Sequence, residues 1–177
     1  MSTGSDARAL ARSLLDLCRS RRLTIATAES CTGGLVAGAL TEIAGSSDVV
    51  DRGFVTYSNG AKNKMLGVPA EALKAFGAVS RETAEAMARG ALANSDAYLA
   101  VSITGIAGPG GGSADKPVGL VHFAAASRSG RLAHVEKRFG DIGRTKVRRA
   151  SVLQALAMLQ ELADKEEPRP PAGSSAP

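Results

Sequence analysis

Residues 23–34 read LTIATAESCTGG, and this stretch decides the fold that we expect. Leu23 to Ala28 is rich in β-forming residues and predicts a short strand. The polar turn that follows ends in Gly33 and Gly34, which allow a ligand to come close to the backbone. A helix is predicted from Gly34 to Ala44. The stretch therefore has the strand–turn–helix order of an α/β protein.

Helical and strand patterns alternate around this stretch. Apolar spacing and capping residues predict helices over 6–20, around Lys62 up to Gly67, after Pro69, over 81–94 and over 144–164. β-forming runs predict strands over 49–57, 98–104, 118–126 and 132–139, the last two joined as a hairpin at Ser129-Gly130. This order predicts an α/β fold, a single-domain three-layer α/β/α sandwich on a mixed β-sheet. Ligands bind such sheets beyond the carboxyl ends of strands, where the loops 28–34, 58–62 and 104–112 begin.

The composition is that of one ordinary globular domain. The chain has 177 residues, 44% of them hydrophobic, and its 22 Lys and Arg against 17 Asp and Glu leave a net charge of +5. We expect the folded domain to cover residues 1–164. The Pro-, Ser- and Gly-rich segment 165–177 is expected to be a disordered tail.

The same composition disfavours several classes of protein. Two cysteines are too few for a disulfide framework, and with only His122 and His134 we expect no metal. The absence of Trp and the small number of Tyr and Phe argue against a nucleic-acid partner, because base stacking needs aromatic side chains. Residues 97–114 are uncharged but interrupted by Gly and Pro, so they cannot span a membrane, and the N-terminus has no apolar signal core. A reduced, cytoplasmic protein is expected.

The first candidate for chemistry is Ser30, in the turn after the predicted strand. A serine displayed on a sharp strand-to-helix turn can act as a nucleophile, and the backbone N–H groups after it can stabilise an oxyanion. The pattern G-x-S-x-G is absent, and Ser30 or Thr32 could instead simply cap the next helix. Cys31 is a rival nucleophile, although a cysteine at such a position is more often a small buried hydrophobe.

A serine nucleophile needs a base, and the segment YSNGAK at 57–62 offers Lys62. The free pKa of a lysine, about 10.4, must fall to about 7–8 for that role, through burial or a nearby cation. The alternative is a solvated helix lysine, which is what we expect of Lys64 and Lys74. Both histidines lie in apolar strand patterns, which argues against a Ser-His triad.

Two further segments can bind an anion. The glycine-rich loop TGIAGPGGG at 104–112 can present backbone N–H groups to a phosphate, although it is neither a Walker A loop nor a GxGxxG fingerprint and could be only a flexible loop. Basic residues cluster at the start of the last predicted helix, where they oppose the helix dipole unless an anion is bound. Arg144 and Arg148 share a face of that helix. Lys146 and Arg149 are expected to be solvent-exposed.

Taken in order, these segments resemble the CinA C-terminal-domain family, the nicotinamide-nucleotide amidases of the PncC type. The resemblance covers roughly residues 8–160. The matching motifs are TAESCTGG at 27–34, GSSDVVDRGFVTYSNGAK at 45–62, MLGV at 65–68, GAVS at 77–80, TGIAGPGGG at 104–112, KPVG at 116–119 and R-x-x-V-R at 144–148.

The resemblance implies hydrolysis of the carboxamide of nicotinamide mononucleotide to nicotinate mononucleotide and ammonia, in pyridine nucleotide salvage. It implies a metal-independent Ser/Lys pair without a cofactor, with Ser30 as the nucleophile, Lys62 as the general base and Tyr57 in the same site. It also implies a small-molecule nucleotide as the partner and a homo-oligomer, a dimer or larger. The residues implied to bind the substrate are Cys31, Thr32, Gly33, Gly34, Thr104, Gly105, Ile106, Ala107, Gly108 and Arg144.

The chain departs from the family pattern in two places. Many members have Gly-Asp-Arg before the last helix, whereas here Gly140 to Arg144 reads GDIGR, and residues 109–112 read PGGG where an acidic residue is often found. Larger members carry an N-terminal nucleotide-pyrophosphatase-like domain, whose activity is not expected here. The alternative to an amidase is a non-catalytic nucleotide-binding module of the same fold.

Overall fold

The computed structural model describes residues 3–171, and the side chains from residue 6 onward. Its centre is a five-stranded sheet of order β2-β1-β3-β4-β5. The strands are β1 (Ile25–Glu29), β2 (Val50–Val55), β3 (Leu99–Gly105), β4 (Leu120–Ser127) and β5 (Leu132–Arg138). β1 pairs in parallel with β2 and β3, whereas β3–β4 and β4–β5 are antiparallel. The predicted mixed sheet and its terminal hairpin are confirmed.

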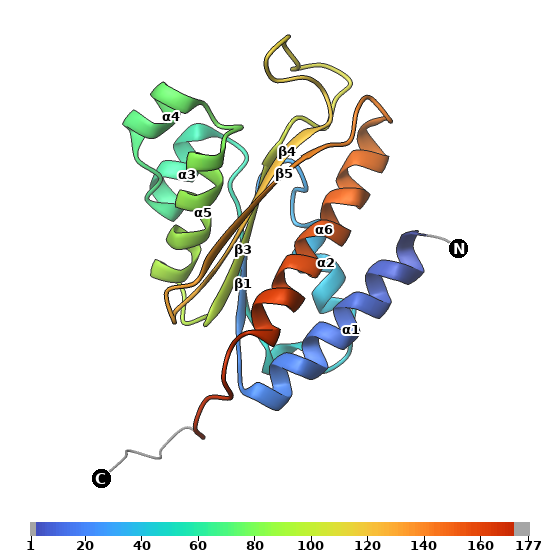
Figure 1. Ribbon diagram of the computed structural model, residues 1–177, viewed down its shortest axis with the longest axis vertical. Coiled ribbons are helices and arrows are strands. Elements are labelled where there is room, and N and C mark those ends of the chain that lie inside the picture. The colour runs from blue at the N-terminus through green and yellow to red at the C-terminus, as the bar shows by residue number, and fades with distance from the viewer. Residues whose placement is uncertain (1–2, 172–177) are drawn as a thin grey trace.

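Helices cover both faces of the sheet (Figure 1). One face carries α1 (Thr3–Arg21), α2 (Leu35–Thr41) and α6 (Arg144–Asp164). The other carries α3 (Asn59–Leu66), α4 (Ala70–Phe76) and α5 (Arg81–Ala93). A single 3-10 turn, Ser46–Asp48, precedes β2. The predicted three-layer α/β/α sandwich is therefore confirmed.

The alternation of side chains along β1 decides what each residue at its end can reach. Ile25 belongs to the core cluster shared with α1, α2 and α6, whereas Ala26 and Ala28 belong to the cluster shared with α3, α4 and α5. Since successive side chains of a strand point to opposite faces, Glu29 is directed to the α2 layer and Ser30 to the α3 layer.

α3 is short, and local signals fix both of its ends. The Ser58 hydroxyl accepts a hydrogen bond from the Ala61 N–H at 3.0 Å, and Gly67 ends the helix in the left-handed region at φ 65°. α3 lies close against α5 because Gly90 has no side chain there: a Cβ at this position would collide with the backbone of Leu66. This close packing places α3 over the end of β1.

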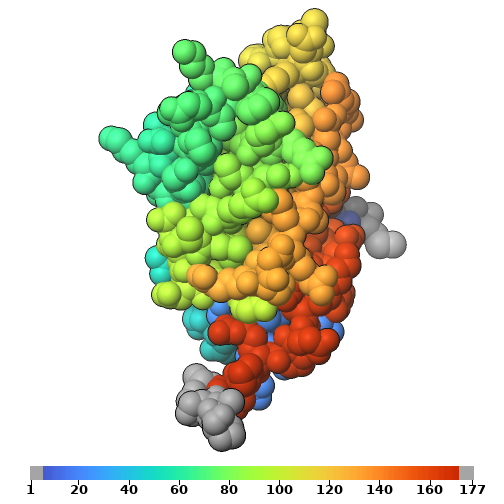
Figure 2. All heavy atoms as spheres, turned by 60° about the vertical axis from the view of Figure 1, so that its left-hand side comes forward, coloured from blue at the N-terminus to red at the C-terminus, as the bar shows by residue number. Residues whose placement is uncertain are grey.

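The segment after α6 differs from the expected disordered tail. Glu166 is only 3% exposed, and its carboxylate accepts a hydrogen bond from the Ser129 hydroxyl at 2.8 Å. Arg21 donates to the carbonyl of Glu166, and the N–H of Arg169 donates to the carbonyl of Arg21. The first residues of the segment therefore pack at the lower end of the molecule (Figure 2). The rest of the expected tail, 172–177, lies outside the described residues.

Candidate active site

Ser30 and Lys62 meet at the carboxyl end of β1. The Lys62 Nζ lies 3.0 Å from the Ser30 Oγ and 2.8 Å from the carbonyl oxygen of Thr56. Ser30 is 9% exposed and Lys62 1%. The Ser30 N–H donates to the carbonyl of Ile103, which holds the serine against β3. Two residues 32 positions apart in the sequence thus form one buried pair.

The surroundings of Lys62 favour its neutral form. Burial lowers the pKa of this amine from 10.5, and the nearby Cys31 thiol opposes the shift only in part. Among the described residues no carboxylate lies within ion-pair distance of the Nζ. A neutral amine can donate to the Thr56 carbonyl and use its lone pair to accept the Ser30 O–H. Lys62 is therefore not a solvated lysine, and it is placed to act as a base.

The cap of α2 is supplied by Glu29. Its carboxylate, 0% exposed, accepts hydrogen bonds from the N–H groups of Gly34, Val36 and Ala37 at 3.1, 3.0 and 2.8 Å. Anions are stabilised at a helix N-terminus in this way. The alternative that Ser30 or Thr32 caps this helix is thus wrong. The Ser30 hydroxyl faces Lys62, and the Thr32 hydroxyl has no hydrogen-bond partner among the described residues.

Cys31, the rival nucleophile, is a buried thiol in the core shared with α1, α2 and α6. Burial raises the pKa of this thiol to about 12. The thiolate is the reactive form of cysteine, and at neutral pH this site holds almost none of it. The interpretation of Cys31 as a small buried hydrophobe agrees with the structure.

A second pair lies at the open side of the site. Arg144, at the start of α6, donates from Nη2 to the Tyr57 Oη at 2.9 Å and from Nη1 to the Gly108 carbonyl at 3.0 Å. Tyr57 is 61% exposed. Arg144 thereby joins the loop after β2 to the loop after β3. Its guanidinium has further N–H donors that make no hydrogen bond to the described residues, so it can bind an anion from solvent.

The other predicted residues of the loop after β3 contribute in different ways. The Thr104 hydroxyl donates to the Ala78 carbonyl at 2.6 Å, and a Cβ at Gly105 would lie 2.7 Å from a methyl group of Val121. Ile106 is bound through its backbone to Leu120 and Gly119. The Ala107 side chain lies in the core. Within residues 3–171, no hydrogen bond to protein engages the N–H of Ala107 or Gly108, so these two donors remain for a ligand.

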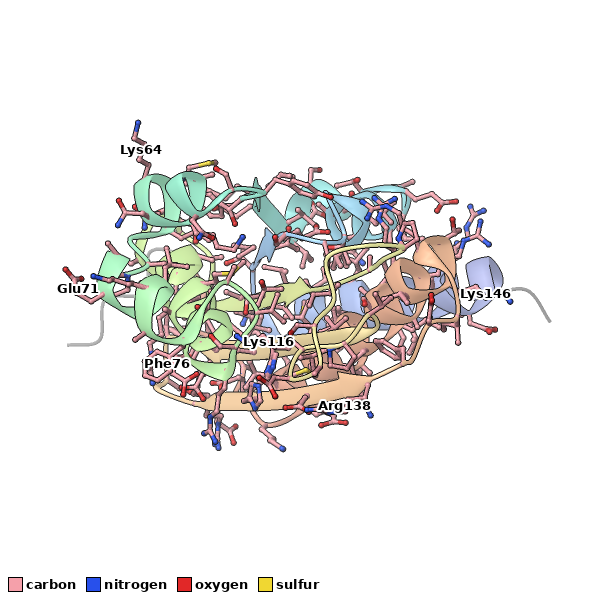
Figure 3. All side chains as sticks on the ribbon, turned by 90° about the horizontal axis from the view of Figure 1, so that it is seen from above. Lys64, Glu71, Phe76, Lys116, Arg138 and Lys146 are labelled. Atoms are coloured by element: carbon pink, nitrogen blue, oxygen red, sulfur yellow. The ribbon has the colours of Figure 1, made fainter. Side chains whose placement is uncertain are left out.

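Two contributors to the site were not identified from the sequence: the Glu29 carboxylate and the Thr56 carbonyl. Arg148, which the sequence placed in a candidate anion-binding cluster, contacts backbone carbonyls instead. Arg148 donates from Nε to the Cys31 carbonyl at 3.1 Å and from Nη2 to the Thr32 carbonyl at 2.9 Å. By contrast, Lys64 and Lys146 project away from the molecule, as predicted (Figure 3).

The two histidines lie side by side on the β4–β5 hairpin. The His122 Nδ1 is 3.0 Å from the His134 Nε2, and the nearest carboxylate to His122 is that of Glu136 at 3.8 Å. Neither histidine contacts Ser30, which agrees with the argument against a triad. In the part of the chain that the structure describes, no group of three or more His, Cys, Asp and Glu could hold a metal ion. Nor is any helix there long and apolar enough to cross a membrane.

Comparison with known families gives one clear match. The family model described as the CinA C-terminal domain matches residues 7–163. A CinA-like protein of Synechococcus sp. is 50% identical over 158 residues, which are 89% of this chain and 38% of the relative. The chain thus spans well under half the length of the first curated relatives that it matches.

Shorter relatives and solved structures match over more of their length. A nicotinamide-nucleotide amidohydrolase PncC of Enterobacter agglomerans is 54% identical over 115 residues, 65% of this chain and 70% of that protein. The competence/damage inducible protein CihA from Agrobacterium tumefaciens is 61% identical in sequence. Its crystal structure matches with a TM-score of 0.88 over 90% of this chain and 96% of that one. A CinA superfamily protein from Klebsiella pneumoniae is 35% identical, with a TM-score of 0.85 over 90% of this chain and 99% of its own.

Proposed function

The chain belongs to the CinA C-terminal domain family, and on this premise we propose that it hydrolyses the carboxamide of nicotinamide mononucleotide. The products are nicotinate mononucleotide and ammonia. A relative that is 54% identical carries the name nicotinamide-nucleotide amidohydrolase, which supports this substrate class. The observation that carries the proposal is the contact of 3.0 Å between the buried Lys62 Nζ and the Ser30 Oγ.

The proposed reaction passes through an acyl-enzyme. The Ser30 Oγ attacks the carboxamide carbon while Lys62 takes the hydroxyl proton. The resulting ammonium then protonates the departing amide nitrogen, which leaves as ammonia. A water molecule attacks the ester that remains while Lys62 takes one of its protons. Lys62 then gives this proton to the Ser30 Oγ as the acyl bond breaks and the acid product leaves.

Two sets of groups are proposed to bind the substrate. The free N–H groups of Ala107 and Gly108 are donors for an anionic oxygen. Arg144, with Tyr57 beside it, supplies a cation at the exposed side of the site, where the 5′-phosphate of the nucleotide is proposed to bind. Deep burial of the nucleophile and exposure of the cation match a substrate whose amide and phosphate lie at opposite ends.

The test is a turnover assay with the purified chain, nicotinamide mononucleotide and a metal chelator. Ammonia and nicotinate mononucleotide are followed by coupled assay and chromatography. We expect turnover by the wild type and none by Ser30→Ala, which should still bind the nucleotide in calorimetry. Binding without turnover in the wild type would indicate the non-catalytic module instead.

Assembly and location belong to the same proposal. We propose a homo-oligomer, a dimer or larger, with a small-molecule nucleotide as its partner, and a cytoplasmic location. Light scattering coupled to size exclusion measures the assembly directly. A monomer at working concentration would contradict that part of the proposal without affecting the chemistry.

A further inference from the structure

Arg148 contacts the turn that carries the proposed nucleophile from the side opposite to Lys62. Its guanidinium is half-buried and spans two consecutive carbonyls, those of Cys31 and Thr32, at 3.1 and 2.9 Å. The approach is close, because a Cβ on Gly33 would lie 3.4 Å from the Arg148 Nη2. We infer that Arg148 is a positioning residue for the amide hydrolysis, and this inference rests on the proposed function.

The turn has little else to hold its shape. Gly33 and Gly34 both adopt positive φ values, 60° and 97°, and the turn's own backbone bonds are Gly33 N–H to Ser30 O and Leu35 N–H to Thr32 O. Outside these bonds, the Ile103 carbonyl holds the Ser30 N–H, Glu29 holds N–H groups on the α2 side, and Arg148 holds carbonyls on the α6 side. Charge-assisted hydrogen bonds are roughly twice as strong as neutral ones, so the two ions dominate the geometry.

The orientation of one peptide group follows from the Arg148 contact. The Cys31 carbonyl and the Thr32 N–H belong to the same planar trans peptide and point in opposite directions. Since Arg148 on α6 holds the carbonyl, the Thr32 N–H is directed away from α6. Among the described residues this N–H has no hydrogen-bond acceptor. It is therefore a third free donor beside the nucleophile, and a cation on the carbonyl strengthens it as a donor.

Arg148 thus acts in two ways through the turn. It keeps the Ser30 hydroxyl in contact with Lys62, and it directs the Thr32 N–H to the oxygen that becomes negative in the transition state. Neither effect requires contact between Arg148 and the substrate. Loss of the side chain should therefore slow the chemical step and leave nucleotide binding nearly unchanged.

The test compares Arg148→Gln and Arg148→Lys with Arg149→Gln in the full chain. Arg149 is the next residue, is exposed and has no hydrogen bond or ion pair to a described residue, so its variant is the matched control. We expect kcat for nicotinamide mononucleotide to fall about 10²-fold in Arg148→Gln with KM within threefold. Arg148→Lys, which can keep one hydrogen bond, should recover about a tenth of the wild-type rate. Arg148→Lys also tests the inference if Arg148→Gln does not fold.

A second readout separates positioning from a loss of folded protein. A fluorophosphonate probe should label Ser30 more slowly in Arg148→Gln but finally to the same stoichiometry as in the wild type. A variant that is merely misfolded in part would show reduced final labelling, and that outcome would overturn the inference. So would an unchanged kcat, or a raised KM with kcat unchanged, which would make Arg148 a substrate ligand. Absence of turnover in the wild type itself would overturn the proposed function and this inference with it.

Discussion

The Ser30–Lys62 pair and the Tyr57–Arg144 pair lie at the same edge of the sheet but in opposite environments. Lys62 is 1% exposed, whereas Tyr57 is 61% exposed. The buried pair is held by β1, β3 and α3, and the exposed pair joins two loops to the start of α6. The first pair is shielded from solvent, whereas the Tyr57 side chain of the second is open to it.

Under the proposed function, this difference assigns the two pairs different tasks on one substrate. Removal of water changes the acid–base chemistry of an amine, so the buried pair is suited to the proton transfers of hydrolysis. An exposed guanidinium retains its charge and attracts a phosphate from solution. We therefore expect changes in the buried pair to act on kcat, and changes in the exposed pair to act on KM.

The largest effect is expected from the buried pair. Ser30→Ala removes the nucleophile, and Lys62→Met removes the base while filling the same space, so kcat should fall about 10⁴-fold or more in each. Steady-state kinetics with nicotinamide mononucleotide measures both variants, and calorimetry should find nucleotide affinity within about fivefold of wild type. Activity near the wild-type level in either variant would end the assignment of this pair.

The pH dependence sharpens the role of Lys62. Its pKa is lowered by burial, and only the neutral amine can accept the Ser30 proton. The rate should therefore decrease about tenfold per pH unit below the lowered pKa and level off above it. A profile of kcat/KM from pH 5 to 10 measures this limb. A profile that keeps rising up to the ordinary lysine pKa of 10.5 would show that burial does not perturb this amine.

A smaller effect is expected from the exposed pair. Arg144→Gln removes one charge-assisted contact to a phosphate, so KM for nicotinamide mononucleotide should rise about 10- to 100-fold with kcat changed little. Nicotinamide riboside, which has no phosphate, is the matched control substrate. If the variant lowers kcat/KM equally for both compounds, Arg144 does not read the phosphate, and the division of roles fails.

The smallest effect concerns stability. Because the pKa of Lys62 is lowered in the folded state, the unfolded chain binds more protons between that lowered pKa and 10.5. The free energy of unfolding should therefore rise with pH across this window, and this gain is lost again as the pH falls. Tm of the wild type minus Tm of Lys62→Met, measured from pH 6 to 10, should increase with pH. A constant difference would mean that folding leaves the pKa of Lys62 unchanged.

The fold, and the loops whose residues form the candidate site, were largely predictable from the sequence. Strand and helix patterns around residues 23–34 are strong and local, and the loops after β1, β2 and β3 meet because parallel strands end at one edge. The backbone contacts of Glu29 and Arg148 were not predictable in this way. Both act through backbone groups of another segment, and a backbone contact requires no particular partner residue in the sequence.

The sequence by itself determined an α/β sandwich, a serine on a strand-to-helix turn and a lysine after the next strand. Only the tertiary structure decided that Lys62 is buried rather than solvated, with its Nζ against the Ser30 hydroxyl and the Thr56 carbonyl. Only it decided that Glu29, and not Ser30, caps α2. Local periodicity fixes which face a side chain takes, whereas desolvation and partner choice depend on what the rest of the chain brings to that face.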